Sequence, residues 1–559
     1  MSIERETFSV ISDEAYRDLE AAVGAEYASR EPGVLEGYAW QPTNNDHPTE
    51  RWVTRPIAVV LPSCTAEVQE VVRACNRHGL KFKAFSTGWG VWNGPTYDNV
   101  VQVDLRRMNR ILEIDEKNMY AVVEPYVCGG ELQAEAMKLG LNTHIIGAGP
   151  ACSPLASATS GWGVGHDGNY MSYSPRNVLG AEWVLPDGEV LRLGTPGSGL
   201  SWFSGDGPGP SLRGIMRGST GTQGSLGVFT KVALKLYDWP GPAETETEGL
   251  LLDAESVVPE ELAFFMCVLP DRASFLEANL KIGEAEIGYN TLRTAVVMYF
   301  NIMTPRLFEK LTRAKTINKI FGDTMEYSLM MVLAGDSKEH LEWQTAVLKN
   351  IVADQGGIVM SMGDLRPFVS MAYLNFIRAT VPALVFRMGG SFNTALSRNE
   401  AIDTQENWRD HCNVIKDKWI KREGIINDLV DNPYYVSYEN NAWAHCEVVY
   451  QFDPRNEKHR VALGPIFTDL TIAAADECME PGFSSDPRVR KIMSPLAANY
   501  NRWQKKISGF LDPKRATDDT LYCREADFDM SNVDPDQRAL LEKIVKEKRW
   551  TESGPPEQG

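Results

Sequence analysis

The chain has 559 residues, of which 43% are hydrophobic and 23% charged, as expected for a folded protein of two or three domains. A formal net charge of −19 argues against a broad surface for nucleic acid or acidic membranes. No run reaches the roughly 18 apolar residues of a membrane span. Nine scattered cysteines without a CxxC pair, together with an N-terminal stretch that lacks an apolar signal core, predict a cytoplasmic protein.

The first part of the chain alternates predicted strands and helices. Residues 57–61 predict a buried strand. A helix with apolar residues at every third or fourth position follows from Thr65, and Gly79 ends it. Further elements predicted in this part are strands at 81–85, 100–105 and 120–124, a helix at 130–139, a hairpin at 182–193, and a strand that ends before Pro240.

The composition changes after Pro242, where a polar linker leads into longer helical patterns such as residues 340–353. Strands are predicted at 294–300 and 446–452, and helices at 499–510 and near 536–550. The predicted division is an N-terminal arm at 1–49, a first domain at 50–242, a second α+β domain at 243–495, and a C-terminal segment at 496–559.

The first domain contains three glycine-rich loops next to predicted strands. Loop one spans 85–92, loop two spans 149–180, and loop three is the glycine-studded turn that opens the stretch 214–242. Such loops allow backbone N–H groups to approach a flat or anionic ligand closely. None has the spacing of a dinucleotide-binding GxGxxG motif or a GxxxxGK[ST] motif. Together they suggest a flavin site.

The order of these strands and loops resembles the vanillyl-alcohol oxidase/p-cresol methylhydroxylase family of FAD enzymes. The resemblance covers residues 50–240, and the tripeptide at 511–513 resembles the return of that family's chain to its FAD domain. The region between residues 240 and 511 resembles the family's cap domain only in its position and length. The resemblance implies an α+β, two-domain flavoprotein with an FAD-binding domain of the p-cresol methylhydroxylase (PCMH) type and an α+β substrate cap.

The resemblance also implies contacts to FAD. Loop one would surround the diphosphate, loop two would follow the ribityl chain and ring, and the other positions would contact the adenine and ribose. The implied cofactor residues are Ser86, Thr87, Gly88, Trp89, Gly90, Val91, Pro150, Cys152, Ser153, Ser157, Gly163, Gly165, Asn177, Val178, Gly224, Gly227 and Val228. Loop one lacks the histidine with which many members tether FAD, so we expect non-covalent FAD, with a tether through Cys152 as the alternative.

Hydride transfer to a flavin requires a group that accepts a hydroxyl proton and groups that orient the substrate. The candidates for these roles are His166, Tyr170, Tyr173, Arg378, Arg387, Tyr435 and His445. Strand periodicity places His445 and Glu447 on the face opposite Cys446. A structural role is the alternative for the histidines and arginines: a hydrogen bond within loop two for His166, internal salt bridges for the arginines, and a plain ion pair for His445 and Glu447. No cluster has metal-ligand spacing, so we expect no metal.

The resemblance implies an oxidase or dehydrogenase that removes a hydride from an alcohol-bearing or benzylic carbon of a small substrate, which could be aromatic. Oxygen or a redox protein would accept the electrons. Residues 479–491 do not reproduce the Tyr-Arg element of the phenol-oxidising members, so a hydroxy acid is an equal candidate. The alternatives are a non-redox transferase of the alkyl-dihydroxyacetone-phosphate synthase type and the flavin subunit of an electron-transfer complex. Assembly into a homo-oligomer is also considered.

Overall fold

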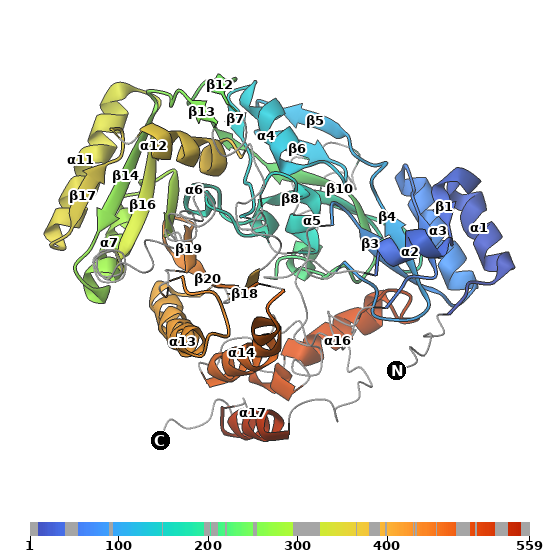
Figure 1. Ribbon diagram of the computed structural model, residues 1–559. Coiled ribbons are helices and arrows are strands. Elements are labelled where there is room, and N and C mark those ends of the chain that lie inside the picture. Colours follow the sequence, from blue (N-terminus) through green and yellow to red (C-terminus); the bar gives the residue numbers. More distant parts are fainter. Residues whose placement is uncertain are drawn as a thin grey trace.

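The protein has a mixed α+β architecture with two sheets in the first domain and a large sheet in the second. The sheet that contains β5, β6, β8 and β10 lies between the β1-β2-β4-β3 sheet and the second domain (Figure 1). The computed structural model describes residues 9–39, 54–88, 93–147, 149–161, 163–194, 199, 202, 211–218, 221–249, 254–293, 325–364, 366–379, 392–396, 400–428, 430, 433–453, 455–476, 492–497, 500–519 and 535–548. Trp89, Gly90, Val91, Arg387 and the predicted strand at 294–300 lie outside these residues. No helix within the described ranges is long and apolar enough to cross a membrane.

The first domain begins with a four-stranded sheet in the order β1-β2-β4-β3. The two central strands and β3 are parallel, and β1 pairs antiparallel with β2, so the predicted N-terminal arm contributes a strand to this sheet. Apolar residues of α1 and α3 cover it, which confirms the predicted helix after Thr65. The bounds are α1 (Asp13–Val23), η1 (Ala25–Tyr27), β1 (Ala28–Ser29), α2 (Pro32–Gly37), β2 (Ala58–Val60), α3 (Thr65–Arg77), β3 (Lys81–Phe85) and β4 (Val100–Asp104).

The second sheet of this domain is antiparallel, in the order β5-β6-β10-β8-β9. Its core contains the stacked rings of Trp183 and Phe229, and α4 and α5 pack on it. The predicted hairpin at 182–193 is present as β8 and β9. The bounds are β5 (Ile111–Asp115), β6 (Tyr120–Val123), α4 (Gly129–Met137), β7 (Leu141–Asn142), α5 (Pro154–Thr159), α6 (Gly168–Met171), η2 (Ser174–Asn177), β8 (Val178–Val184), β9 (Val190–Leu193), η4 (Leu212–Ile215), β10 (Val228–Lys235) and β11 (Tyr237–Asp238).

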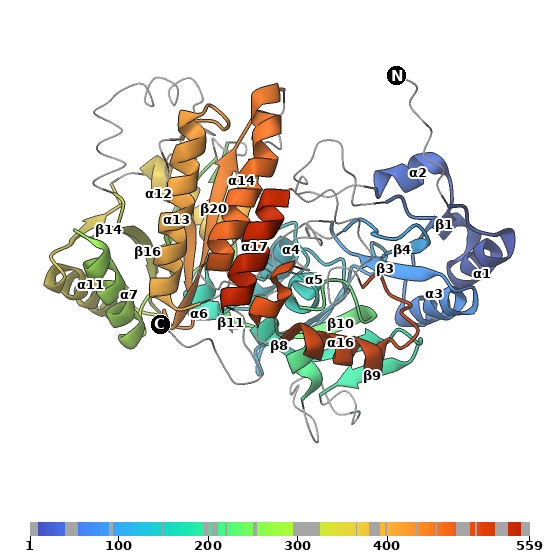
Figure 2. The ribbon, with the colours of Figure 1, turned by 90° about the horizontal axis from the view of Figure 1, so that it is seen from below.

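The second domain contains a seven-stranded antiparallel sheet in the order β17-β14-β16-β15-β19-β20-β18. Helices α7, α11, α13 and α14 cover one face, and α12 and η7 lie on the face toward the first domain (Figures 1 and 2). The bounds are β12 (Thr247–Glu248), β13 (Glu255–Ser256), β14 (Leu262–Val268), α7 (Arg272–Glu284), β15 (Asn290–Arg293), β16 (Ser328–Ala334), α11 (Lys338–Asp354), β17 (Ile358–Ser361), α12 (Arg366–Ala372), η7 (Tyr373–Ile377), β18 (Phe392–Leu396), α13 (Ile402–Lys421), β19 (Tyr434–Tyr438), β20 (Trp443–Gln451) and α14 (Glu457–Asp476).

The two domains share one hydrophobic core. Residues of the first domain such as Tyr173 and Trp239 pack against the sheet residues Phe264 and Tyr438 of the second. Hydrogen bonds cross the same interface, including one of 2.8 Å from Asn142 Nδ2 to the Tyr289 hydroxyl. Because this interface is both apolar and hydrogen-bonded, it fixes the position of the second sheet over loop two.

The C-terminal segment contributes to both domains. Helix α16 (Tyr500–Leu511) packs on the second sheet of the first domain through Ile507 and Leu511. Helix α17 (Pro535–Lys548) instead packs against α14 of the second domain (Figure 2). Its apolar face, which includes Leu541 and Ile544, is buried there. The described helices α16 and α17 of this segment therefore pack on different domains.

Candidate functional site

Loops one and two meet at a single backbone carbonyl, that of Pro125 after β6. The hydroxyls of Ser86 and Ser153 both donate hydrogen bonds to this oxygen, the second at 2.6 Å. The Ser153 N–H also donates to Thr87 Oγ1 at 3.2 Å. These contacts hold the start of loop one against loop two, beyond the carboxyl end of β3.

Loop two is fixed by the N-terminus of α4. The N–H groups of Gly129 and Gly130 donate to the carbonyls of Cys152 and Pro150 at 2.8 and 2.9 Å. Ser153 caps α5, and the Ser157 hydroxyl donates to the Ser153 carbonyl. The Cys152 thiol is buried, and burial raises its pKa, which keeps it in the weakly nucleophilic thiol form.

Loop three packs tightly on β8. Gly227 has φ of +116°, and a Cβ at this position would lie 2.2 Å from the Val184 carbonyl oxygen, so only glycine fits. Gly224 also has a positive φ, and Val228 begins β10 directly afterwards. Glycine is therefore required in this loop, because of the positive φ values and because the loop backbone lies so close to β8.

Several implied cofactor residues also have structural roles. Asn177 donates from Nδ2 to the Met171 carbonyl and accepts a hydrogen bond of 2.6 Å from the Tyr237 hydroxyl. The Val178 carbonyl accepts from Arg213. A Cβ at Gly165 would lie 2.0 Å from the Ile145 carbonyl oxygen, and one at Gly163 would lie 2.6 Å from the Ser174 Cβ. A contact between these residues and a ligand would have to use their backbone.

A buried ion pair joins loop two to the segment after β7. His144 Nδ1 is hydrogen-bonded to Asp167, and His144 Nε2 lies 2.8 Å from the Gly163 carbonyl oxygen. Since both partners are acceptors, the ring satisfies them together only as the doubly protonated imidazolium. Burial lowers the pKa of His144, but the charge of Asp167 and these hydrogen bonds outweigh it, so the pKa is raised.

His166 lies beside this pair and reaches the second domain. Its ring makes edge contacts with Phe376 of η7 and Tyr434 of β19, at centroid distances of 4.8 and 5.2 Å. Its Nδ1 is covered and has no hydrogen-bond partner among the described residues. Burial lowers the pKa of His166 to about 4, so the imidazole is neutral at pH 7.

His445 and Glu447 of β20 complete this group on the side of the second domain. His445 pairs across the strands with Val436, which packs in the interdomain core, so both lie on the face toward the first domain. The His445 ring is 6.4 Å from that of Tyr434, and its Nε2 is 3.8 Å from Glu447 Oε2. We call the five residues the seam cluster: His166, Phe376, Tyr434, His445 and Glu447.

Two of the predicted catalytic residues lie elsewhere. Tyr435 is on the helix-covered face of the sheet, packed against Phe275 and Arg293, because neighbouring strand residues point to opposite faces. Arg378 donates to the carbonyls of Pro242 and Ala243 in the interdomain linker, at 3.1 and 3.0 Å. The structure therefore places neither side chain in the seam cluster; within the described ranges, Arg378 also forms no salt bridge, the alternative considered for it.

The tyrosines of loop two lie at the interdomain interface. Tyr173 donates its hydroxyl to the Arg217 carbonyl at 2.8 Å and packs edge-on against Trp443. Tyr170 is 42% exposed and stacks at a tilt on Tyr237 and Tyr289. Neither contacts His166 through any described ring contact or hydrogen bond, so the structure does not bring them into the seam cluster.

The catalytic prediction from sequence did not include Tyr434 or His144. Tyr434 is one residue before the predicted Tyr435, and the strand register derived for His445 would have selected it, because Tyr434 pairs with Glu447. A Cβ at Gly147 would lie 2.9 Å from the Tyr434 hydroxyl, so this glycine makes room for the phenol. His144 stands 22 residues before His166 in sequence, and no local pattern connects it with Asp167.

Comparison with known proteins identifies the fold and the cofactor class. A family model described as an FAD binding domain matches residues 56–194. The chain is 32% identical over 221 residues to the flavoprotein subunit of 4-cresol dehydrogenase (hydroxylating) from Pseudomonas putida, which covers 38% of this chain and 40% of that protein. It is 32% identical over 192 residues to 1'-carboxy-chondrochloren decarboxylase from Chondromyces crocatus, covering 33% and 34%. The chain thus spans only about a third to two fifths of the length of these relatives.

The solved structure of p-cresol methylhydroxylase with substrate bound superimposes with a TM-score of 0.71 at 18% identity, over 93% of this chain and 99% of that one. An alkyldihydroxyacetonephosphate synthase gives 0.62 at 15% identity, over 93% and 88%. At these identities the structures show a shared fold. The chain therefore has the fold of p-cresol methylhydroxylase, with an FAD binding domain matched at residues 56–194.

The described residues fit FAD. Hydrogen bonds hold the start of loop one against loop two, and the glycines of loop three pack closely on α5 and β8. Small residues and glycines of this kind allow the backbone to approach a flat or anionic ligand. The seam cluster lies where the cap meets loop two, the usual place for a substrate pocket between domains. Across the described ranges, no three His, Cys, Asp or Glu side chains form a group that could hold a metal ion.

Proposed function

We propose that the protein is an FAD-dependent oxidase or dehydrogenase that oxidises a small substrate at an alcohol-bearing or benzylic carbon, in the seam cluster. The observation that supports this most directly is His166, a neutral histidine with an unpartnered Nδ1 at the junction of FAD-binding domain and cap. FAD, when bound, supplies the acceptor for the hydride. The electrons then pass to oxygen or to a redox protein.

His166 is suited to accept the substrate's hydroxyl proton. Because its pKa is lowered to about 4, the ring is neutral at pH 7, and its unprotonated nitrogen can accept a proton. The charges of Asp167 and Glu447 favour the protonated ring that results. Tyr434 and Phe376, in edge contact with the ring, hold its plane and exclude water from one side.

We propose that FAD is bound without a covalent tether. The raised pKa of the buried Cys152 thiol supports this, because attack on a flavin ring requires the thiolate. The described cysteines are all free, which supports a cytoplasmic location. A homo-oligomer is proposed as well, and size-exclusion chromatography with light scattering would test it.

The visible spectrum of the purified protein before and after acid precipitation tests the cofactor. Flavin bands that move to the supernatant would support non-covalent FAD, and bands that stay in the pellet would indicate a tether. Anaerobic mixing with a 4-alkylphenol, a benzylic alcohol, D-lactate and glycolate tests the reaction, since relatives include a D-lactate dehydrogenase and a glycolate oxidase subunit. The proposal requires at least one alcohol, phenol or hydroxy acid to bleach the flavin.

A second candidate is a non-redox transferase, which the likeness in fold to alkyldihydroxyacetonephosphate synthase favours. Product analysis separates the two functions. An oxidoreductase forms one reduced acceptor for each product, whereas a transferase forms product without net reduction of an acceptor.

A further inference from the structure

The chain returns to the FAD-binding domain through residues 512–519, which follow α16. The Phe82 N–H donates to the Ala516 carbonyl at 2.9 Å, and the Asp518 N–H donates to the Phe82 carbonyl at 3.1 Å. Thr517 forms a parallel bridge with Phe82. Since β3 is the last strand of its sheet, these residues pair with an edge that leads directly into loop one.

Asp518 is the centre of this attachment. Its carboxylate accepts hydrogen bonds from the Thr96 N–H and hydroxyl at 2.7 and 2.5 Å, and lies 3.6 Å from Lys83 Nζ. Both charged side chains are 2% exposed or less. Lys83 also donates to the Gly94 carbonyl at 2.9 Å. Removal of the Asp518 charge should strongly destabilise this region, because it would leave the buried Lys83 ammonium without a compensating charge.

The same residue contacts loop three. The Ser225 hydroxyl donates to the Asp518 carbonyl at 2.9 Å. Lys83 Cε lies 4.0 Å from the point that a Gly224 Cβ would occupy, so the Lys83 stem runs beside this loop. One residue of the return therefore links β3, the segment after loop one and loop three, which are distant in sequence.

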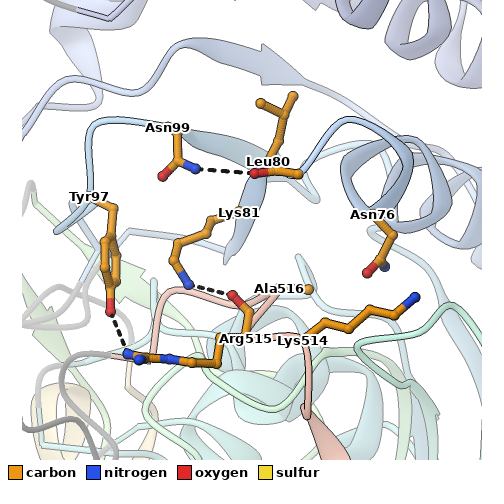
Figure 3. A pocket seen from close by; sticks show the side chains of 9 residues that line it. Asn76, Leu80, Lys81, Tyr97, Asn99, Lys514, Arg515 and Ala516 are labelled. Carbon is orange, nitrogen blue, oxygen red and sulfur yellow. Dashed lines mark hydrogen bonds between the residues drawn. The ribbon is translucent and has the colours of Figure 1, made fainter.

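Further contacts hold the outer side of the return. Lys81 donates to the Arg515 carbonyl, and Tyr97 accepts from Arg515, as Figure 3 shows. Lys81 also donates to the Thr517 carbonyl at 3.1 Å, its ammonium lies over the Tyr97 ring, and Tyr97 donates to Asp519 at 2.8 Å. Lys81, Tyr97 and Arg515 are among the residues that line a surface pocket of about 460 Å³. Because Lys81 and Arg515 are already engaged, we assign no ligand to this pocket.

We propose that residues 512–519 form a clasp for the cofactor: they fix loop one and loop three relative to each other, and Asp518 and Lys83 are positioning residues for FAD retention. This inference rests on the proposed FAD site. The cause is geometric, since each loop is anchored separately but the clasp sets the distance between them. Loosening the clasp should weaken FAD binding more than it weakens the fold.

The test is Asp518→Asn in the full chain, compared with Asp428→Asn. Asp428 forms an equivalent buried pair in the cap, 2.5 Å from Lys416 Nζ and equally enclosed, and belongs to none of the three loops. FAD is stripped, and its dissociation constant is measured by quenching of flavin fluorescence, together with the Tm of each apo-protein. We expect Asp518→Asn to weaken FAD binding at least tenfold, and Asp428→Asn to change it less than twofold despite a similar loss in apo Tm.

Equal FAD affinity in Asp518→Asn and wild type would overturn the clasp proposal. An equal loss of FAD affinity in Asp518→Asn and Asp428→Asn would overturn it as well. If Asp518→Asn does not fold, Ser225→Ala removes one hydrogen bond to the same residue and should weaken FAD about threefold; an unchanged affinity would contradict the clasp. A wild-type chain that does not bind FAD would instead refute the proposed function, so the two failures are distinguishable.

Discussion

His144 and Asp167 form a buried ion pair, and Asp167 directly follows His166 in the chain. The pair sets opposite charge states on two neighbouring histidines: Asp167 raises the pKa of His144, while burial and the charge on His144 lower that of His166. Titratable neighbours whose pKa values are pushed apart in this way are typical of acid–base sites. The charged His144 thus helps to keep His166 free to accept a proton.

Replacement of His166 by Gln should slow flavin reduction by a factor of about 10²–10⁴, because the group that accepts the substrate proton is lost. The flavin spectrum should change little, because His166 lies in loop two but its Nδ1 has no hydrogen-bond partner among the described residues. Anaerobic stopped-flow absorbance with a bleaching substrate measures the rate. The matched control is His340→Gln on the exposed side of α11, and a His166 variant as fast as this control would remove His166 from the mechanism.

The pH dependence should carry the signature of a lowered histidine pKa. With a pKa of about 4, His166 stays neutral down to that pH, so the rate of flavin reduction should fall near pH 4 and not near 6.5. The unfolded chain takes up the proton first, so stability falls as pH drops from about 6.5 toward 4. Between pH 7 and 5 this amounts to about 1–2 kcal/mol. Urea unfolding at both pH values should show this loss as a change in the difference between the unfolding free energies of wild type and His166→Gln.

The contribution of His144 to stability should depend on pH in the opposite direction to that of His166. Because its folded pKa is raised, its pair with Asp167 contributes fully below the unfolded pKa of about 6.5 and loses that contribution as pH rises through the folded value. The destabilisation caused by His144→Gln should therefore be largest at pH 6 and smaller at pH 9. A Tm difference between wild type and variant that stays constant over this range would mean that His144 is not charged.

Gly168 tests the fit between cap and FAD-binding domain. A Cβ there would lie 2.4 Å from the Tyr438 ring, so Gly168→Ala should destabilise the protein by about 1–3 kcal/mol through overpacking. Gly509→Ala in α16 is the control, because its Cβ would meet no atom within 4 Å, and better helix propensity should raise stability slightly. Thermal unfolding compares the two variants. Equal Tm values would show that the interface around Tyr438 accommodates the extra methyl group without a loss of stability.

Arg378→Gln should lower the Tm and leave the rate of flavin reduction within about twofold of wild type. The guanidinium holds two linker carbonyls and lies near the Trp239 ring, and these contacts support the interdomain linker. A large loss of rate with an unchanged Tm would restore this arginine as a substrate ligand. Differential scanning fluorimetry and stopped-flow absorbance on the same preparation provide both values.

The fold was largely predictable because its elements have clear periodicity. The helix from Thr65 and the strand at 81–85 follow directly from apolar spacing, and the hairpin at 182–193 follows from its turn residues. The placement of α17 on the cap was not predictable. Its amphipathic pattern shows that one face is buried, but a pattern does not identify the partner, here α14.

The site was predicted only in part, because strand periodicity does not show which side chains meet across the fold. His166 and His445 come together in the seam cluster, but Tyr435 was one residue out of register in a strand whose residues alternate between two faces. A one-residue error there moves a side chain to the other side of the sheet. His144 depends on a long-range contact with Asp167, and the linker contacts of Arg378 depend on tertiary structure, so local spacing indicates neither.

The pairing of residues 516–518 with β3 affects how the chain folds during synthesis. The cap is synthesised after loop three and before residues 516–518, so this edge of β3 stays unpaired until the whole cap has left the ribosome. Open strand edges are sites of mispairing between chains. Nascent chains that stall or terminate within the cap should therefore aggregate readily, and capture of the cofactor should be among the last events of folding.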